Sequence, residues 1–139
     1  MPRFVRRIAS ALQVPRGRKV AGRLADQNGS PIGQLLANGS DQQQVNNRAT
    51  LREDGNWRRL RVALAHVEGH AAALMRANRS YHDMHLVITR RPCEGPLGCD
   101  AQLPALLPAG SSLTVWVRSS EGAEPKKWHT YPGTGEGVR

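Results

Sequence analysis

Aromatic residues and cysteines are both scarce in this sequence. Phe, Trp and Tyr together make up 4% of the 139 residues, so the core must rest on Leu, Val, Ile and Ala. The two cysteines, Cys93 and Cys99, are too few for the disulfide framework that stabilises many small secreted domains. They leave a single disulfide or a metal site as the possible uses of cysteine.

Long apolar runs are also missing. A helix that crosses a bilayer needs about 18 to 20 consecutive apolar residues, and no segment approaches that length. The N-terminus has a basic flank, but the apolar run that follows it, Ile8 to Leu12, is too short for a signal peptide. We therefore expect no membrane partner, and any delivery of this chain would be encoded outside it.

Acidic residues are few relative to basic ones. The chain has 11 Asp and Glu against 20 Lys and Arg, which gives a net charge of +9 and a pI near 11.0. Residues 1–30 alone hold seven basic residues and one acidic residue. A protein this basic attracts polyanions. Charge alone would allow nucleic acid, an acidic membrane or an acidic protein as the partner, and the alternative is that the charge only makes the surface soluble.

The length suits one domain with one core. Apolar residues at helical spacing predict a short helix over Arg3–Gln13, which Pro15 ends. We set residues 1–18 apart as a basic N-terminal helix and linker, and we take residues 19–139 as a single domain.

Within that domain the elements alternate. Asp26 to Gly29 is a turn signal that joins two short strands into a hairpin, residues 38–47 form a polar loop, and residues 56–64 form a short helix or turn. The predicted strands are Val20–Ala25, Ile32–Ala37, Met84–Thr89 and Leu113–Val117, with an edge strand near Lys127–Tyr131. The predicted helices are His66–Asn78 and Cys99–Leu107. This alternation predicts an α/β fold, in which helices pack on a sheet.

One motif in the sequence points to a specific chemistry. His66-Val67-Glu68-Gly69 stands at the start of the first main helix. After the next strand comes Pro92-Cys93, and Cys99 follows at the start of the next helix. An H-x-E followed by P-C and a second cysteine is the pattern of zinc-dependent nucleobase deaminases.

The residue types in the motif fit a catalytic zinc ion. Such an ion takes three protein ligands and keeps one position open for water, and His66, Cys93 and Cys99 supply one imidazole and two thiolates. A bound metal lowers the pKa of that water to about 7. Glu68, two residues past His66, is near the metal but free of it, so it can act as the general acid and base.

Each part of the motif also has a plainer interpretation. A histidine at a helix start can be a cap, two cysteines can be free thiols or a disulfide, and Glu68 can simply favour the helix dipole. The metalloprotease motif H-E-x-x-H is excluded because Glu68 is second after His66 rather than first. His70 is then expected on the helix surface beside the site. The cysteine spacing departs from the usual C-x-x-C, because five residues separate Cys93 from Cys99.

The stretch from His66 to Val117 resembles the DddA-like family of bacterial toxin deaminases, which are C-terminal warheads of polymorphic toxins. The matching pieces are His66–Gly69, Ala73–Arg76, Pro92–Cys93, Gly98–Cys99, Leu106–Pro108 and Leu113–Val115. The resemblance implies a cytidine-deaminase-like fold with a mixed central sheet of about five strands, zinc on His66, Cys93 and Cys99, and Glu68 as proton shuttle. It also implies a DNA substrate and a cognate immunity protein that blocks the site.

A base stacked inside a duplex cannot reach such a site, so the enzyme must use single strands or flip the base out. Binding of single strands combines basic grooves with aromatic side chains on which bases stack. The candidates for these contacts are Arg58, Arg59, Arg61, Arg90 and Arg91, with Trp57, Trp116 and Trp128 for stacking. The alternatives are a solvated basic face for the arginines and core or sheet packing for the tryptophans.

The sequence thus favours hydrolytic deamination of cytosine to uracil in DNA. We expect the chain to be a monomeric toxin domain that is delivered as part of a larger protein and acts in the cytoplasm of a recipient cell. Alternative substrates are RNA, adenine or a free nucleoside, although a free nucleoside does not require a charge of +9. A further alternative is a non-catalytic basic module that binds nucleic acid and holds a structural metal or disulfide. A structural zinc would want a fourth protein ligand, and the motif offers three.

Overall fold

The computed structural model describes the chain except residues 16, 18, 38–65, 79, 93–98 and 139. Strands and helices alternate as predicted, and the α/β fold is confirmed. In chain order the elements are α1 (Arg3–Ala11), β1 (Ala21–Ala25), β2 (Pro31–Ala37), α2 (Val67–Ala77), β3 (Asp83–Ile88), α3 (Cys99–Leu106), β4 (Ser112–Val117) and β5 (Lys126–Pro132).

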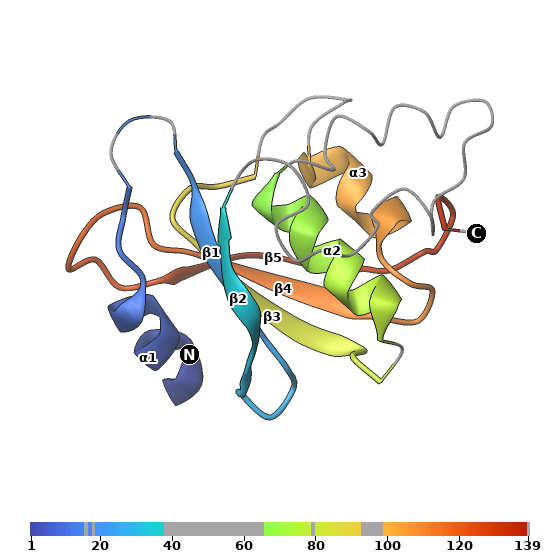
Figure 1. Ribbon diagram of the computed structural model, residues 1–139, viewed down its shortest axis with the longest axis horizontal. Coiled ribbons are helices and arrows are strands. Elements are labelled where there is room, and N and C mark those ends of the chain that lie inside the picture. The colour runs from blue at the N-terminus through green and yellow to red at the C-terminus, as the bar shows by residue number, and fades with distance from the viewer. Residues whose placement is uncertain (16, 18, 38–65, 79, 93–98, 139) are drawn as a thin grey trace.

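The strands form one mixed sheet of five strands in the order β2-β1-β3-β4-β5 (Figure 1). β3 and β4 pair in parallel because α3 crosses over between them, while the other neighbouring strands are antiparallel. β5, which the sequence predicted as an edge strand, lies at one edge of the sheet. Its exposed Lys126 and Lys127 discourage pairing of this edge with another chain.

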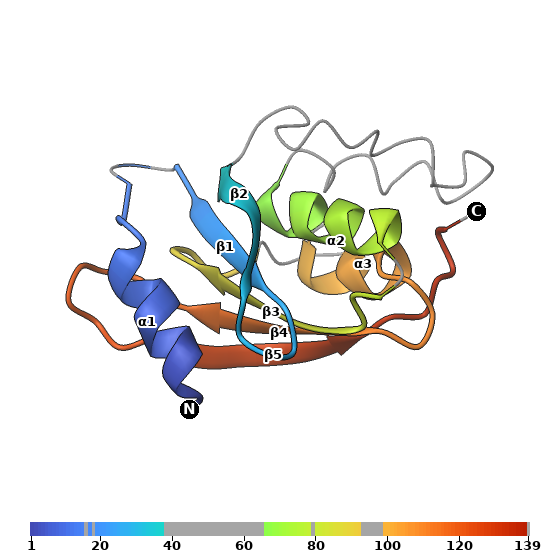
Figure 2. The same cartoon turned by 60° about the horizontal axis from the view of Figure 1, so that its bottom comes forward.

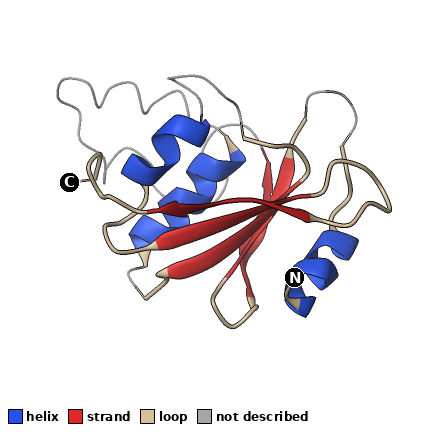
Figure 3. Ribbon diagram, turned by 180° about the vertical axis from the view of Figure 1, so that it is seen from behind, coloured by secondary structure: helices blue, strands red, loops and turns tan. Residues whose placement is uncertain are grey.

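Helices pack on both faces of the sheet. α2 and α3 cover one face and α1 covers the other, as Figure 2 and, from behind, Figure 3 show. Because side chains alternate along a strand, Leu86 of β3 packs beneath α2 and α3, whereas its neighbour Val87 packs beneath α1. The larger core, beneath α2 and α3, is mostly aliphatic, as the low aromatic content predicted, and Tyr131 is its buried aromatic residue.

The turn between β1 and β2 is fixed by its own residues. The Asp26 carboxylate accepts hydrogen bonds from the backbone N–H groups of Asn28 and Ser30, each at 2.9 Å. Gly29 has a φ of +86°, a conformation that L side chains rarely adopt, and the ring of Phe4 in α1 lies against it. The hairpin predicted from Asp26 to Gly29 is therefore confirmed.

Helix α1 is held against the sheet by apolar packing and by one arginine. Val5 and Leu12 are buried, and Arg118, which follows β4, is only 6% exposed. Arg118 Nη1 donates hydrogen bonds to the carbonyl oxygens of Ala9 and Leu12 at the end of α1, where the Ala9 carbonyl also accepts from the Leu12 N–H at 3.1 Å. The helix predicted within residues 1–18 is confirmed, whereas the domain boundary at residue 18 stays a prediction.

The predicted bounds of the first main helix, His66–Asn78, include both of its caps, since α2 itself runs from Val67 to Ala77. The polar loop predicted over residues 38–47 and the short helix or turn predicted over residues 56–64 lie outside the described residues. In the part of the chain that the structure describes, no helix is long and apolar enough to cross a membrane.

Candidate active site

The start of α2 holds two residues of the motif. His66 is the N-cap, with an extended backbone, and its carbonyl accepts a hydrogen bond from the His70 N–H at 3.0 Å. Glu68 lies in the first turn and is buried, with 5% of its surface exposed. The helix dipole favours a negative charge there, yet burial of a carboxylate costs free energy. A buried carboxylate in this place is a candidate for proton transfer.

The start of α3 holds a third residue of the motif. Cys99 is the first residue of α3, and Asp100 follows it in the first turn. The Tyr131 hydroxyl of β5 donates a hydrogen bond to Asp100 Oδ1 at 2.5 Å. The Trp128 indole N–H lies 3.1 Å from the Tyr131 oxygen and 3.4 Å from Asp100 Oδ1. These contacts fix the first turn of α3 against β5.

Tyr131 connects the starts of the two helices. Burial, above all, raises the pKa of Tyr131 far above its usual range, and the hydrogen bond and charge of Asp100 raise the pKa further. The charge of Glu68 acts in the same direction, so Glu68 is within electrostatic reach of the same phenol. The phenol therefore keeps its proton and serves as a donor. The first turns of α2 and α3 therefore both lie near this phenol.

A buried arginine joins the other ends of these helices. Arg76, in the last turn of α2, is 4% exposed and donates a hydrogen bond from Nη1 to the carbonyl oxygen of Leu106 at 2.9 Å. Leu106 ends α3, so its carbonyl has no donor within the helix. Burial lowers the pKa of Arg76 to about 10, which leaves it charged at neutral pH. The two helices thus run side by side in the same sense (Figure 1).

A glycine in β1 lets α2 begin close to the sheet. A Cβ atom on Gly22 would lie 2.5 Å from Cγ1 of Val67 and 3.0 Å from Cγ2 of Ile88. Val67 stands between His66 and Glu68, so Gly22 sets how deeply the motif sits against the sheet. Gly22 was not singled out from the sequence, although a glycine inside a strand pattern is a signal of close approach.

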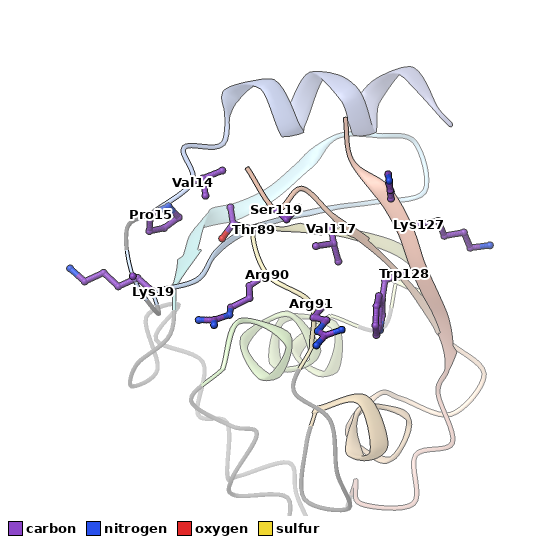
Figure 4. A pocket seen from close by; sticks show the side chains of 12 residues that line it. Val14, Pro15, Lys19, Thr89, Arg90, Arg91, Val117, Ser119, Lys127 and Trp128 are labelled. Atoms are coloured by element: carbon purple, nitrogen blue, oxygen red, sulfur yellow. The ribbon is translucent and has the colours of Figure 1, made fainter. Parts of the chain in front are cut away.

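The substrate-binding candidates from the sequence have different surroundings. Arg90 and Arg91 follow β3, are exposed, and line a pocket that Figure 4 shows. Trp116 is 8% exposed and packs beneath α1, where its indole N–H donates to His85 Nδ1 at 3.1 Å. Trp116 therefore shows the sheet packing that was the alternative to stacking on a base. The candidates outside the described residues are Trp57, Arg58, Arg59 and Arg61.

The surface position expected for His70 is wrong. Most residues of α2 are buried, because the helix packs on the sheet along one side and against α3 along another. His70 is 1% exposed and lies inside this packing.

Two of the three proposed metal ligands belong to this corner of the fold. His66 caps α2 and Cys99 begins α3, the helices whose first turns flank Tyr131. Cys93 lies outside the described residues, and within those residues no three His, Cys, Asp or Glu side chains cluster as metal ligands. Zinc accepts an imidazole and two thiolates as ligands, so Glu68 is not needed as a ligand and can transfer protons. The residues present therefore fit a zinc ion.

Comparison with protein-family models gives a match over almost the whole chain. The model described as SCP1.201-like deaminase matches residues 1–133. That range includes α1, the five strands of the sheet, and both helices on which the motif lies. A search of curated proteins finds no match to the chain.

Proposed function

Because this chain belongs to the SCP1.201-like deaminase family, we propose that it deaminates cytosine to uracil in DNA, with zinc as its cofactor. The observation that carries the proposal is the buried carboxylate of Glu68 at the start of α2. It lies within electrostatic reach of Tyr131, whose hydroxyl binds the residue directly after Cys99. In zinc deaminases such a carboxylate moves protons and does not bind the metal.

The residues that would hold the zinc ion are His66, Cys93 and Cys99. When bound, the ion supplies the charge that lowers the pKa of a water molecule to about 7 and makes it a nucleophile at neutral pH. His66 and Cys99 stand at helix starts. The dipole at a helix N-terminus favours an anionic cysteine thiolate over a thiol. Three protein ligands leave a position free for the reacting groups.

Glu68 supplies the proton transfers of this reaction. Its carboxylate takes a proton from the attacking water as that water adds to C4 of cytosine, and it passes the proton to the base so that ammonia can leave. Water is consumed and ammonia is released, so no other reactant is needed. Tyr131 acts as a positioning residue, because its retained proton bonds Asp100 and holds the start of α3 in place.

The charge of the chain supports a nucleic acid as the substrate. A net charge of +9 would be of no use to an enzyme that acts on free nucleosides, which have no phosphates. Arg90 and Arg91 are exposed and stand three and two positions before Cys93 in the sequence. Trp57, Arg58, Arg59 and Arg61 remain candidates for further contacts to the strand. RNA is the alternative substrate, because its phosphates would be attracted equally.

The resemblance to DddA-like deaminases supports a role as the toxic C-terminal domain of an interbacterial toxin. On this proposal a larger protein delivers the domain, and the domain acts as a monomer in the cytoplasm of the recipient cell. A cognate immunity protein blocks the site in the producing cell. Growth arrest with uracil in chromosomal DNA is the expected result of expressing the domain without that protein, and Glu68→Gln should abolish both.

The proposed function is tested by comparing the wild-type protein with Glu68→Gln on a DNA oligonucleotide that contains one cytosine. The amide cannot take a proton from water, so we expect uracil formation to fall by roughly 100- to 10,000-fold. Folding and zinc content should be unchanged, because Glu68 is not a ligand. Glu136→Gln, which removes an exposed carboxylate, is the matched control and should keep full activity. Turnover by Glu68→Gln at the wild-type rate would contradict the assignment of the proton shuttle.

A further inference from the structure

A pocket of about 560 Å³ lies where the segment before β1 passes the ends of β3 and β4 and the start of β5. This volume is in the range of sites that hold small organic ligands. Figure 4 shows Arg91, Val117 and Trp128 around the hollow, whereas the side chains of Lys19 and Lys127 extend outward at its rim. The residues that give the pocket its character are five basic ones and a tryptophan: Lys19, Arg90, Arg91, Lys126, Lys127 and Trp128.

Four of the five basic residues of this pocket have no acidic partner among the described residues. None of the described residues that line it is acidic, and these residues make no ion pair with Lys19, Arg90, Lys126 or Lys127. Like charges gathered in a hollow repel one another and concentrate a positive field. Such an arrangement favours a ligand with several negative charges. Four such cations are more than one phosphate group requires, which favours a ligand that carries a chain of phosphates.

Trp128 gives the basic pocket an aromatic wall. The residue is 37% exposed, which is unusual for a tryptophan in a chain with so few aromatics. Its N–H edge is anchored at 3.1 Å to the Tyr131 oxygen, and Figure 4 shows one face of the ring turned toward Arg91. Phosphate binding alone does not need a flat aromatic surface. Cations along a backbone combined with a ring for stacking are typical of sites for single-stranded nucleic acid.

The basic pocket adjoins the candidate active site through two short connections. Trp128 contacts Asp100, the residue directly after Cys99. Arg91 lies two positions before Cys93 in the sequence. A strand whose target base enters the active site would therefore pass through the basic pocket with the nucleotides next to that base.

We propose that the basic pocket binds the single-stranded DNA that flanks the target cytosine, with its lysines and arginines on the phosphates and Trp128 stacked on a flanking base. The proposal rests on the proposed function only in placing the target base beside the pocket. Binding of the strand itself does not depend on turnover.

The experiment measures the dissociation constant of a fluorescently labelled single-stranded DNA oligonucleotide in the Glu68→Ala background, where no turnover occurs. Lys126→Gln with Lys127→Gln is compared with Arg3→Gln with Arg7→Gln, which removes the same charge from α1 on the opposite face of the sheet. We expect the pocket pair to weaken binding roughly tenfold and to reduce the salt slope by about 1.4, as for two lost phosphate contacts. The α1 pair should change binding little. Equal losses in both pairs would overturn the proposal.

Trp128 is tested with two substitutions. Trp128→Ala should weaken binding roughly 5- to 100-fold, because one stacked base is lost. Trp128→Phe keeps a flat ring but loses the N–H bonds to Tyr131 and Asp100, and it should retain most of the affinity. A loss in Trp128→Phe as large as in Trp128→Ala would contradict stacking and leave only a structural role. Zinc content and thermal unfolding of each variant separate loss of binding from loss of fold.

Two further results separate this inference from the proposed function. If the wild-type protein binds single strands through Lys126, Lys127 and Trp128 but forms no uracil, the inference stands and the proposed function fails. If the protein forms uracil while the pocket variants bind and turn over like the wild type, the inference fails alone. A duplex that binds as tightly as the single strand, with no effect of Trp128→Ala, would also overturn the inference, because paired bases cannot stack on a side chain.

Discussion

Gly22 and Val67 touch at the point where α2 begins, so a single methyl group at this position tests how the site is supported. In Gly22→Ala the new Cβ would meet Cγ1 of Val67 at 2.5 Å, and the first turn of α2 must move away from the sheet. We expect a loss of about 1 to 3 kcal/mol in the free energy of unfolding from this overpacking. Because His66 and Glu68 flank Val67, activity per folded molecule should fall as well.

Gly110→Ala is a suitable control for that substitution. Gly110 has a φ of +81°, and a Cβ atom there would meet nothing within 4 Å. It should therefore lose about 1 kcal/mol or more through backbone strain, while zinc content and activity per folded molecule stay at the wild-type level. If Gly22→Ala also kept full activity per folded molecule, the depth of α2 would not control the site.

The zinc ligands are tested by metal content rather than by activity. Cys93→Ala and Cys99→Ala should each lose stoichiometric zinc, because a site with three protein ligands cannot spare one of them. His82→Ala removes an exposed histidine and serves as the control that keeps its zinc. Zinc retained in Cys93→Ala at one equivalent would show that the pair of cysteines separated by five residues is not the ligand pair.

At the level of elements, the contact between α1 and the sheet depends on a neutral histidine. Trp116 Nε1 donates to His85 Nδ1 at 3.1 Å, so that nitrogen carries no proton, and the Phe4 ring packs edge-on against the imidazole at a centroid distance of 4.9 Å. Burial lowers the pKa of His85 below its ordinary value, and the charge of Asp83 opposes this only in part.

The stability of the fold should therefore decrease in mild acid. The unfolded chain takes up a proton at His85 near the ordinary pKa of about 6.5, before the folded chain does, so the free energy of unfolding falls as the pH drops below that value. Urea unfolding at about pH 7.5 and about pH 5.5 measures the loss. His85→Phe should show a smaller loss than the wild type, and His82→Gln should not. The same pH dependence in His85→Phe and the wild type would contradict this account of α1.

The elements themselves were largely predictable from the sequence, because their signals are local. The Asp26 side chain fixes the first hairpin through residues two and four positions away, and periodicity alone marked α1 and α2. The predicted bounds of α2 were also close to the observed ones, because the residues next to a helix end indicate its caps. The attachment of α1 was not predictable. It depends on Arg118, which is 109 residues from Ala9 and reads in the sequence as one more basic surface residue.

At the level of the whole molecule, the motif residues could be identified from the sequence, but the residues that surround them in the fold could not. The order of His66, Glu68, Cys93 and Cys99 indicated the chemistry, whereas Tyr131 joined the site only through the pairing of β4 with β5. Trp128 falls at the register shift of this pairing and has no partner in β4, whereas Trp116 packs beneath α1. Composition gave no means to distinguish the two tryptophans. The basic pocket likewise gathers its basic residues from three separate stretches of the chain, so the excess of basic charge was predicted but the place of the pocket was not.

The central claim is that this fold holds a zinc site that deaminates cytosine in DNA. Its most direct test is the conversion of single-stranded and double-stranded oligonucleotides, each with one cytosine, by zinc-loaded protein, with the product read by uracil-specific cleavage. The account predicts cleavage of the single strand, and the yield with the duplex measures whether the protein also flips a base out of paired DNA. No cleavage of either substrate by folded, zinc-loaded protein, across varied flanking bases, would contradict the claim.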